Sequence, residues 1–412
     1  MILTRAPKKL FIYSFSRIAL FTKINAKSVS MTKISTKILT SYRVIFLTAG
    51  GSKMSTAFPT LLRQMSALGA TDMFLSRGKS ATYRINGKLT TTEGDGLTEE
   101  DLDLICAGVT SEEQNQRFRD QLELNISYKA AGIGRFRISI FRQMQNTSMV
   151  VRAIPSSIPT PEDLGLPPIV TELAAKKRGL ILIVGPSGSG KSTSLASLIN
   201  QRAKETASHI ITIEDPIEYI INHGDSVINQ REIGIDTHSF HNALESALRQ
   251  SPDVLCIGEI RSKDTMDHAL MFVDSGHFCM ATLHANNATQ AIERILNFFP
   301  ENKRDQILLG LSMNLRAIIA QQLVPDIEGN LTAVFELLQA SPRISDLIEN
   351  GDFAGMRESM EKDTSDMLSL DQSLFNLYSK KIISAQTAME YANSYRDMRL
   401  KMRLTNTAPS LV

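Results

Sequence analysis

A glycine-rich segment at residues 185–193, Gly-Pro-Ser-Gly-Ser-Gly-Lys-Ser-Thr, fits the Gly-x4-Gly-Lys-Ser/Thr pattern of a phosphate-binding loop. The apolar residues 180–184 before it predict a buried strand, and apolar side chains at helical spacing follow it. In such a strand–loop–helix unit, backbone amides and the helix N-terminus hold phosphate oxygens. We expect Lys191 to contact the β- and γ-phosphates and Ser192 to bind Mg²⁺. The predicted nucleotide-binding residues are Gly185, Pro186, Ser187, Gly188, Ser189, Gly190, Lys191, Ser192 and Thr193.

An acidic segment, residues 212–218, overlaps the end of the next predicted strand, which covers residues 209–213. Its Glu214, Asp215 and Glu218 are candidates for the carboxylate that orients and polarises a water molecule attacking a phosphate. A solvated acidic turn has the same composition. The segment alone leaves both interpretations open.

A third predicted strand, Asp253–Ile257, is followed by Gly258 and Glu259. An apolar strand that ends in an acid is typical of the carboxylate that holds the Mg²⁺ shell in nucleotide-binding sites. Because glycine occupies the position before the acid, Glu259 alone has to supply this charge. The alternative is an exposed glutamate at the end of a strand.

Two histidines, His277 and His284, flank a fourth apolar strand. We expect His284, with Thr282 nearby, to sense a γ-phosphate where this strand ends. A histidine whose ring is hydrogen-bonded within the core fits the same position. No cysteine or acid stands at ligand spacing from either histidine, so a metal site is not indicated there.

Three arginines, Arg135, Arg137 and Arg142, lie in or beside an amphipathic segment well ahead of the glycine loop. A planar guanidinium suits the clamping of phosphate oxygens, so these side chains could complete a nucleotide site. They could equally be solvated residues on the outer face of a strand.

The composition limits the classes of protein that need considering. A chain of 412 residues with 42% apolar and 21% charged residues accommodates two or three globular domains. Three cysteines exclude a disulfide framework and a four-cysteine zinc site, and Cys256 and Cys279 in apolar runs indicate buried thiols in a reducing compartment. Beyond residue 53, 35 basic and 43 acidic residues leave a net charge of −8, which does not indicate a nucleic-acid-binding surface.

Residues 1–53 are rich in Ser and Thr and hold ten Lys and Arg but no Asp or Glu. This composition fits a transit peptide, a disordered tail, or an upstream region wrongly included in the reading frame. We favour the last interpretation, with Met54 as the start, because globular patterning begins directly after it. No apolar run in the segment approaches the roughly 18 residues that span a bilayer.

Pattern changes divide the rest of the chain. Residues 54–155 combine an amphipathic helix with short alternating strands and predict a small α/β domain. Prolines predict an extended linker at residues 156–175. Residues 176–330 alternate strands with helices, which predicts a parallel sheet with its ligand at the carboxyl ends of the strands. Residues 331–412 have a mostly helical pattern.

Taken together, these motifs resemble the secretion-ATPase superfamily and, within it, the type IV pilus retraction ATPases of the PilT/PilU kind. The resemblance covers the chain from about Thr56 to near its C-terminus. It rests on the glycine loop and, in the family's order, Ile213-Glu-Asp-Pro-Ile-Glu218, Asn229-Gln-Arg-Glu232, Ile257-Gly-Glu-Ile-Arg261 and Gly276-His…Thr282-Leu-His284.

Several segments look more like the PilU branch than the PilT branch. They are Gly276–Asn287, Ile295-Leu-Asn-Phe-Phe-Pro300 and the tail Tyr395–Arg403. PilT proteins carry Ala-Ile-Arg-Asn-Leu where this chain has Pro342-Arg-Ile-Ser-Asp-Leu-Ile348.

The resemblance implies a PAS-like N-terminal α/β domain, a linker, and a RecA-like P-loop NTPase domain with a helical C-terminal part. It implies that ATP and Mg²⁺ bind, with Ser192 and Glu259 on the metal side and Glu218 activating water. It makes His277 and His284 the histidine-box pair. Arginines of the first domain, Arg135 and Arg137 among them, complete the site, and Arg294 is a weaker candidate.

The resemblance further implies a cytoplasmic homo-hexameric motor at the inner-membrane face of the pilus machine. Its partners are a PilT-type paralogue and an inner-membrane platform protein, with no nucleic acid and no zinc. ATP hydrolysis then powers pilus retraction and twitching motility, with this protein as a PilU-like accessory to the main retraction ATPase.

Three alternatives remain open at this stage. A pilus-assembly or type II secretion ATPase commonly carries a four-cysteine zinc insertion, which this chain cannot form. A largely non-hydrolytic partner that stabilises an active motor is disfavoured by the intact set of Lys191, Glu218, Glu259 and His284. A DNA helicase is disfavoured by the acidic body and by the lack of a basic groove with aromatic residues.

Overall fold

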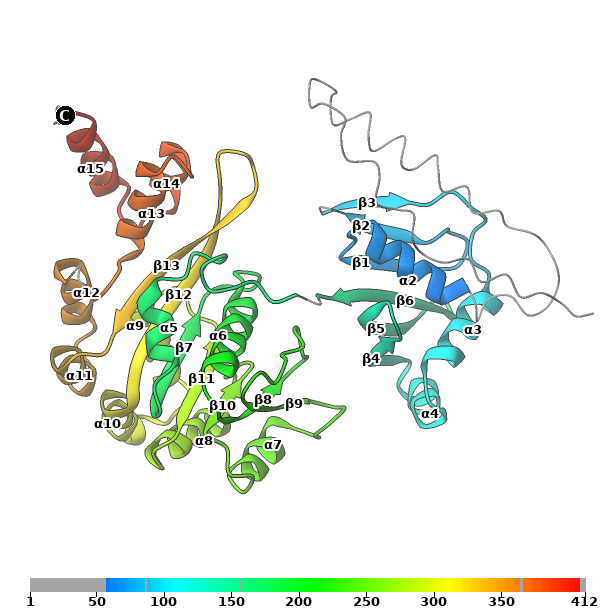
Figure 1. Ribbon diagram of the computed structural model, residues 1–412, viewed down its shortest axis with the longest axis horizontal. Helices are drawn as coiled ribbons and strands as arrows, with labels where there is room; N and C mark the ends of the chain where they lie inside the picture. The colour runs from blue at the N-terminus through cyan, green and yellow to red at the C-terminus, as the bar shows by residue number, and fades with distance from the viewer. Residues whose placement is uncertain (1–56, 86, 156, 364–365, 408–412) are drawn as a thin grey trace, which may run out of the picture. The chain divides into compact units, whose positions relative to one another are not determined.

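The computed structural model describes residues 57–85, 87–155, 157–363 and 366–407 (Figure 1). The interpretations of residues 1–53, and of Met54 as the start, lie outside the described residues. The described chain is a mixed α/β structure that contains two sheets.

The first sheet is antiparallel and has six strands in the order β3-β2-β1-β6-β5-β4. Phe136, Ile138 and Ile140 alternate along β5 and are buried, as the alternating pattern predicts. They share one apolar core with Leu62 and Met65 of α2, the predicted amphipathic helix. The elements are α2 (Ala57–Ala67), β1 (Asp72–Leu75), β2 (Thr82–Ile85), β3 (Lys88–Thr91), α3 (Glu99–Val109), α4 (Glu112–Gln121), β4 (Glu123–Ala130), β5 (Gly134–Gln143) and β6 (Asn146–Ile154).

The second sheet has seven strands in the order β13-β12-β7-β11-β10-β8-β9. Neighbouring strands are parallel except for the antiparallel pair β12–β13. The strands predicted near residues 180–184, 209–213, 253–257 and 277–283 are confirmed. The elements are β7 (Gly179–Val184), α6 (Lys191–Glu205), β8 (His209–Glu214), β9 (Val227–Glu232), α7 (Phe240–Ala247), β10 (Val254–Ile257), α8 (Lys263–Asp274), β11 (Phe278–Leu283), α9 (Ala288–Leu296), η1 (Glu301–Lys303), α10 (Arg304–Asn314), β12 (Leu315–Pro325) and β13 (Leu331–Gln339).

Helices cover both faces of this sheet (Figure 1). α6 packs on one face together with α5 (Pro168–Ala174), which lies inside the segment expected to be an extended linker. Helices α7 to α10 pack on the other face, together with α11 (Pro342–Glu349) and α12 (Phe353–Lys362). Because the central strands are buried on both faces, their sequences are continuous apolar runs rather than alternating ones.

The helical pattern expected from residue 331 onward is wrong at its start. Residues 331–339 form β13, which pairs with β12 along its whole length. The sequence Leu-Thr-Ala-Val-Phe-Glu-Leu-Leu-Gln is a short apolar run, and periodicity alone cannot separate a buried strand of this kind from a buried helix. Its hydrogen bonds to β12 decide the outcome.

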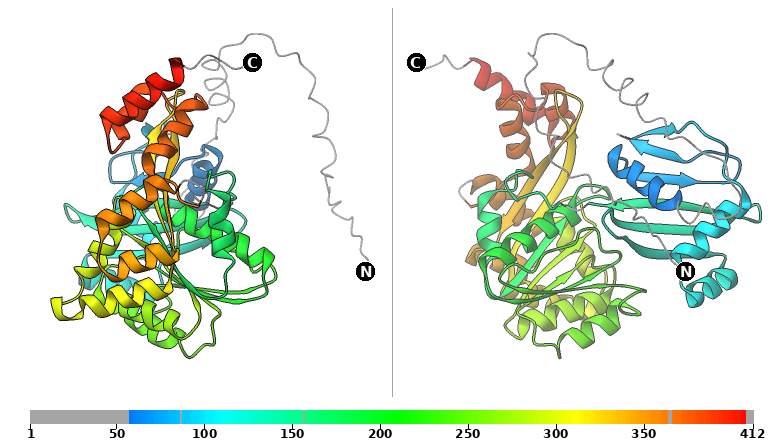
Figure 2. Two further views of the ribbon diagram at one scale, coloured as in Figure 1. Left: turned by 90° about the vertical axis from the view of Figure 1, so that its left-hand side faces the viewer. Right: turned by 45° about the vertical axis from the view of Figure 1, so that its right-hand side comes forward.

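The remaining helices gather beside the outer part of the β12–β13 hairpin (Figures 1 and 2). They are α13 (Leu370–Ser379), α14 (Ala385–Tyr391) and α15 (Tyr395–Thr407). Leu370 and Leu374 pack with Val324 and Val334 of the hairpin in a small separate core. The C-terminal helices are therefore attached to the strands of the main sheet.

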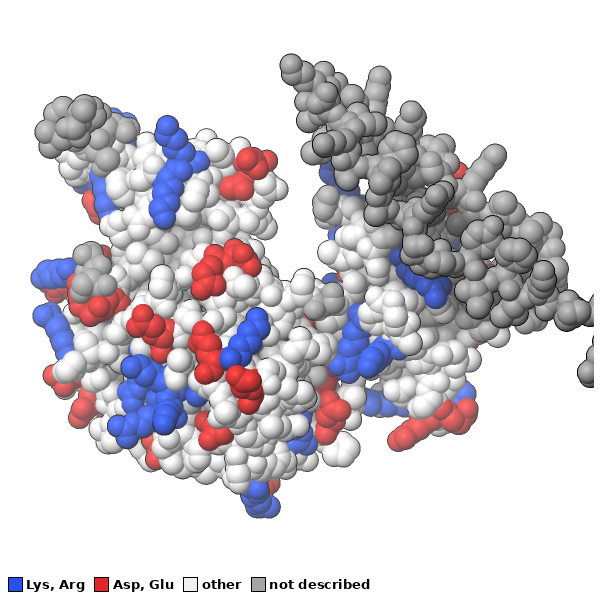
Figure 3. All heavy atoms as spheres, in the orientation of Figure 1, with Lys and Arg blue, Asp and Glu red and all other residues white. Residues whose placement is uncertain are grey.

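The surface drawn in Figure 3 carries acidic and basic side chains interspersed. In the part of the chain that the structure describes, none of the helices combines the length and apolarity needed to cross a bilayer.

A buried arginine connects α6, the helix after the glycine loop, to the end of α5. Arg202 of α6 is 5% exposed and donates hydrogen bonds to the carbonyls of Ala174 and Lys176. Its guanidinium also lies over the Phe278 ring, 5.0 Å from the ring centroid. These contacts hold the C-terminal end of α6 against α5 and the sheet.

We expect Arg202→Met to lower the free energy of unfolding by about 2 kcal/mol, because one buried and one partly buried carbonyl lose their donor. Urea denaturation of the full chain measures the change. The matched control is Lys204→Met on the exposed side of the same helix, where the expected change is below about 0.5 kcal/mol. Equal effects in the two variants would contradict a specific role for Arg202.

Candidate nucleotide-binding site

Four parallel strands, β7, β8, β10 and β11, end at the same edge of the large sheet. Ile257 of β10 pairs with Ile213 of β8 and Ala281 of β11, so the segments that follow these residues begin at one level. A cavity of ≈ 210 Å³ lies there. Its lining brings Lys191 and Ser192 of the glycine loop together with Glu218, Glu259, Arg261 and His284.

The glycine loop has the shape of a phosphate cradle. Gly190, the residue before α6, has φ +88°, a left-handed conformation that glycine adopts without strain. A Cβ at Gly185 would lie 2.3 Å from the Gln321 carbonyl oxygen. The buried Ser189 hydroxyl has no hydrogen-bond partner among the described residues. Phosphate oxygens, which accept hydrogen bonds, fit this loop at the N-terminus of a helix.

Gln321 of β12 packs against the glycine loop. This residue was not identified in the sequence analysis. Its side chain is 2% exposed, and its Oε1 accepts a hydrogen bond from the Ser194 hydroxyl at 2.7 Å. Its amide nitrogen lies 2.8 Å from where a Cβ on Gly190 would stand. No local pattern could have linked Gln321 to a loop so distant in sequence, because only the pairing of β12 with β7 brings them together.

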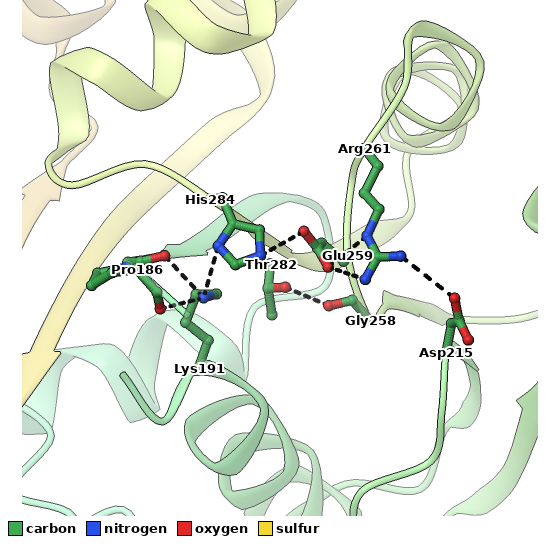
Figure 4. Close-up of polar contacts among 9 residues, drawn as sticks. Pro186, Lys191, Asp215, Gly258, Glu259, Arg261, Thr282 and His284 are labelled. Carbon is green, nitrogen blue, oxygen red and sulfur yellow. Dashed lines mark hydrogen bonds and ion pairs between the residues drawn. The ribbon is translucent and has the colours of Figure 1, made fainter. Parts of the chain in front are cut away.

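Lys191 is a buried residue, enclosed by the glycine loop. Its Nζ donates to the carbonyls of Gly185 and Pro186 at 2.9 and 2.8 Å, and it lies 3.5 Å from Nδ1 of His284 (Figure 4). Burial lowers the pKa of its ammonium group, and the nearby Glu259 carboxylate acts in the opposite direction. The charge of Lys191 is therefore held where an anionic ligand would gain most from it.

His284 and Glu259 form a direct pair across the cavity. His284 Nε2 lies 2.9 Å from Glu259 Oε1, while its other nitrogen faces Lys191, which can only donate (Figure 4). The arrangement favours the tautomer that carries its proton on Nε2 and accepts at Nδ1. Thr282 donates to the Gly258 carbonyl beside this pair and fastens the end of β11 to that of β10.

Arg261 extends this network and is a residue whose role the sequence analysis did not assign. Its Nη2 and Nε lie 2.6 and 2.7 Å from Glu259 Oε2, and its Nη1 lies 3.5 Å from Asp215 Oδ2. The hydrogen bond to Glu259 raises the pKa of the guanidinium. Its position in the Gly-Glu-Ile-Arg segment, two residues after the predicted metal-side acid, was the available signal.

The acidic segment separates into carboxylates with different surroundings. Glu214 is largely enclosed and accepts hydrogen bonds from Thr212 and Gln230, and burial raises its pKa. Asp215 faces Arg261. Glu218 lines the cavity, and its carboxylate has no hydrogen-bond or ion partner among the described residues. Asp215 and Glu218 both line the cavity, and Glu218 is the one whose carboxylate has no side-chain partner among the described residues.

Other residues singled out in the sequence lie elsewhere. His277 precedes β11 whereas His284 follows it, so the strand separates them by about 20 Å. The His277 ring stacks on Phe272 and bonds Ser275, and it does not line the cavity. The Thr193 hydroxyl bonds Tyr219 at 3.1 Å.

The arginine candidates are also outside this cavity's lining. Arg135 and Arg137 lie on β5 of the antiparallel sheet. Arg294 of α9 lines a neighbouring hollow, which shares Gly185, Pro186 and His284 with the glycine-loop region.

The residues suit a nucleoside triphosphate with its divalent cation. Ser192 and Glu259 are the groups that would hold Mg²⁺, since both residues line the cavity and carry side-chain oxygen atoms. Among the described residues, no group of three His, Cys, Asp or Glu side chains could hold a metal ion by itself.

Comparison with known proteins identifies the family of the chain. The family model described as "Type II/IV secretion system protein" matches residues 68–373. The type IV pilus ATPase PilU of Pseudomonas aeruginosa is 45% identical over 349 residues, which cover 84% of this chain and 91% of that protein. The type IV pilus retraction ATPase PilT of the same organism is 34% identical, covering 81% of this chain and 97% of PilT.

A solved structure has the same fold. The crystal structure of the pilus retraction motor PilT with bound ADP superposes with a TM-score of 0.79 at 36% identity, covering 83% of this chain and 98% of that one. The PilT/PilU resemblance and the α/β secretion-ATPase fold are thereby confirmed. The chain belongs to the type II/IV secretion system protein family, within its group of PilT/PilU pilus ATPases.

Proposed function

We propose that this protein hydrolyses ATP and uses the energy for type IV pilus retraction, as a PilU-like accessory to the main retraction ATPase. One observation carries the enzymatic part: an unpaired carboxylate, Glu218, lines the same cavity as the glycine loop, Glu259 and His284. The names of the relatives support the pilus part, because PilU and PilT of P. aeruginosa are described as type IV pilus ATPases.

Binding of ATP exchanges partners around Lys191. Its ammonium group leaves the carbonyls of Gly185 and Pro186 and turns to the β- and γ-phosphates, while the loop amides and the Ser189 hydroxyl donate to phosphate oxygens. These contacts contribute strongly to the free energy of ATP binding, because the donors are already held in place and partly shielded from water. Ser192 and Glu259 would hold Mg²⁺, which would neutralise charge on the phosphates.

Hydrolysis follows from the position of Glu218. Its carboxylate orients a water molecule and accepts a proton as the water oxygen bonds to the γ-phosphorus. The bond from that phosphorus to the β–γ bridging oxygen breaks, and ADP leaves with the bonding electrons. The Nε2–H of His284 exchanges Glu259 for a γ-phosphate oxygen when ATP binds, and it returns to Glu259 when that phosphate leaves.

Loss of the γ-phosphate contacts is the step that does mechanical work in this proposal. Arg135 and Arg137 bring the PAS-like domain, residues 54–155, to the nucleotide, and release of phosphate lets the domains swing about the part of the 156–175 linker that precedes α5. A homo-hexamer in the cytoplasm coordinates these swings at the inner-membrane platform protein. A PilT-type paralogue is the partner motor.

Replacing Lys191 by Ala is expected to lower ATP turnover by about 100-fold or more, because the transferred phosphoryl group loses its cation. A phosphate-release assay on the full chain measures the rate. Lys204→Ala on the exposed side of the same helix serves as the control and retains turnover. Near-normal turnover in the Lys191→Ala variant rejects the assignment.

Glu218→Gln is expected to separate binding from chemistry. We predict a fall in kcat of about 100-fold or more with little change in nucleotide affinity, because the amide keeps the size of the side chain but is a poor proton acceptor. Turnover and equilibrium binding of a fluorescent ATP analogue are measured side by side, with Glu205→Gln as the surface control. An equal loss of binding would assign Glu218 a different role.

In cells, Glu218→Ala is expected to impair pilus retraction in proportion to this protein's share of the work. Surface-pilus dynamics are followed with the PilT-type paralogue present and absent, and ATPase activity is measured with and without that paralogue. Normal dynamics in both backgrounds would defeat the motor hypothesis. If ATPase activity is detected only when the paralogue is present, the protein acts as an accessory to that motor.

A further inference from the structure

The loop that carries His284 is anchored at its far end by a buried glutamate. Residues 284–287 connect β11 to α9, and the first amide of α9, that of Ala288, donates to Glu336 Oε1 at 2.8 Å. Glu336 lies on β13 and is 7% exposed. His284 at one end of the loop contacts Glu259, and Ala288 at the other end contacts Glu336.

This anchor has few substitutes. Ala288 is fully buried, so its amide depends on a protein acceptor. A carboxylate at the N-terminus of a helix is also electrostatically favoured. Burial raises the pKa of Glu336, whereas the hydrogen bond from Ala288 acts in the opposite direction. Keeping such a group inside the protein is costly, and fixing the start of α9 offsets that cost.

The same turn is held from the C-terminal side. Arg357 of α12 donates its Nε–H to the Thr289 hydroxyl at 3.2 Å. That hydroxyl donates to Oδ1 of Asn287, which in turn caps the amide of Gln290 at 2.9 Å. Glu336, Thr289 and Arg357 line one hollow of ≈ 340 Å³. A C-terminal helix therefore reaches the loop that carries His284 through named polar contacts.

We propose that Glu336 is a positioning residue for His284 and that, together with Arg357, it couples the C-terminal helices to the nucleotide cavity. The inference rests on the proposed ATPase function and deepens it. When α12 shifts, the contact between Arg357 and Thr289 moves the first turn of α9. The loop of only four residues transmits this movement to His284 and thus to the γ-phosphate. Movement at the nucleotide reaches the C-terminal helices by the same route.

The test compares two substitutions at one position. Glu336→Gln keeps an acceptor oxygen for the Ala288 amide, whereas Glu336→Leu removes it with a similar volume. We expect Glu336→Leu to lower kcat about tenfold with little change in KM, because His284 is displaced rather than the glycine loop. Glu336→Gln retains kcat within about twofold. Arg357→Ala lowers kcat in the same direction, and Lys362→Ala, exposed on the same helix, does not.

A double-mutant cycle separates positioning from a general loss of structure. If Glu336 acts through His284, adding Glu336→Leu to His284→Ala causes no further fall in the single-turnover rate. Multiplying effects overturn the proposal. Wild-type protein and Lys191→Ala are assayed in parallel: turnover lost on removing Lys191 supports the ATPase function whatever happens at Glu336.

Hydrogen exchange supplies a readout that needs no turnover. In the full-length protein, Glu336→Leu is expected to raise the exchange of amides 284–288, while Glu336→Gln leaves it unchanged. Unchanged exchange in both variants, or an increase confined to α9 beyond residue 288, overturns the proposal even if the protein hydrolyses no ATP.

Discussion

The parallel pairing of β7, β11, β10 and β8 is the constraint on which the rest of the site depends. Parallel strands carry all their carboxyl ends to one edge, so each of the segments that follow them starts beside the others. The registers of Ile257 with Ile213 and Ala281 place Gly258, Glu214 and Thr282 at the same level. A shift of one residue would turn these side chains to the opposite face of the sheet. The cavity thus inherits its geometry from backbone hydrogen bonds in a fully buried core.

The charged side chains at the edge of this sheet form contacts that they can exchange for contacts to a ligand. Glu259 is shared by His284 and Arg261, and Lys191 rests on carbonyls of its own loop. These contacts satisfy the hydrogen-bonding capacity of buried polar groups, and each can be replaced by a contact to a ligand. A triphosphate offers several strong acceptors to the same donors and can displace the weaker ones. Glu218 differs because it lines the cavity and its carboxylate makes no hydrogen bond or ion pair among the described residues.

The hairpin β12–β13 contacts both the nucleotide-binding region and the C-terminal helices, which are distant from each other in sequence. Gln321 of β12 supports the glycine loop, and Glu336 of β13 holds the start of α9. The same hairpin forms a core with α13 and its neighbours. A closely packed sheet transmits small displacements because it has little free space in which to absorb them. The hairpin contacts the helix after the glycine loop, the start of α9 and the C-terminal helices.

Much of this protein is determined by its sequence alone. The glycine loop, the apolar strands and the acids that follow them are local patterns, because dihedral requirements and side-chain periodicity act over a few neighbouring residues. Other features depend on the tertiary structure. Residues 331–339 form a strand, and His277 lies outside the cavity. Glu214 and Asp215 have side-chain partners whereas Glu218 has none among the described residues, and partners are also fixed for Arg261, Gln321 and Glu336. Those outcomes depend on which distant strands pair and in which register, and no local pattern encodes that choice.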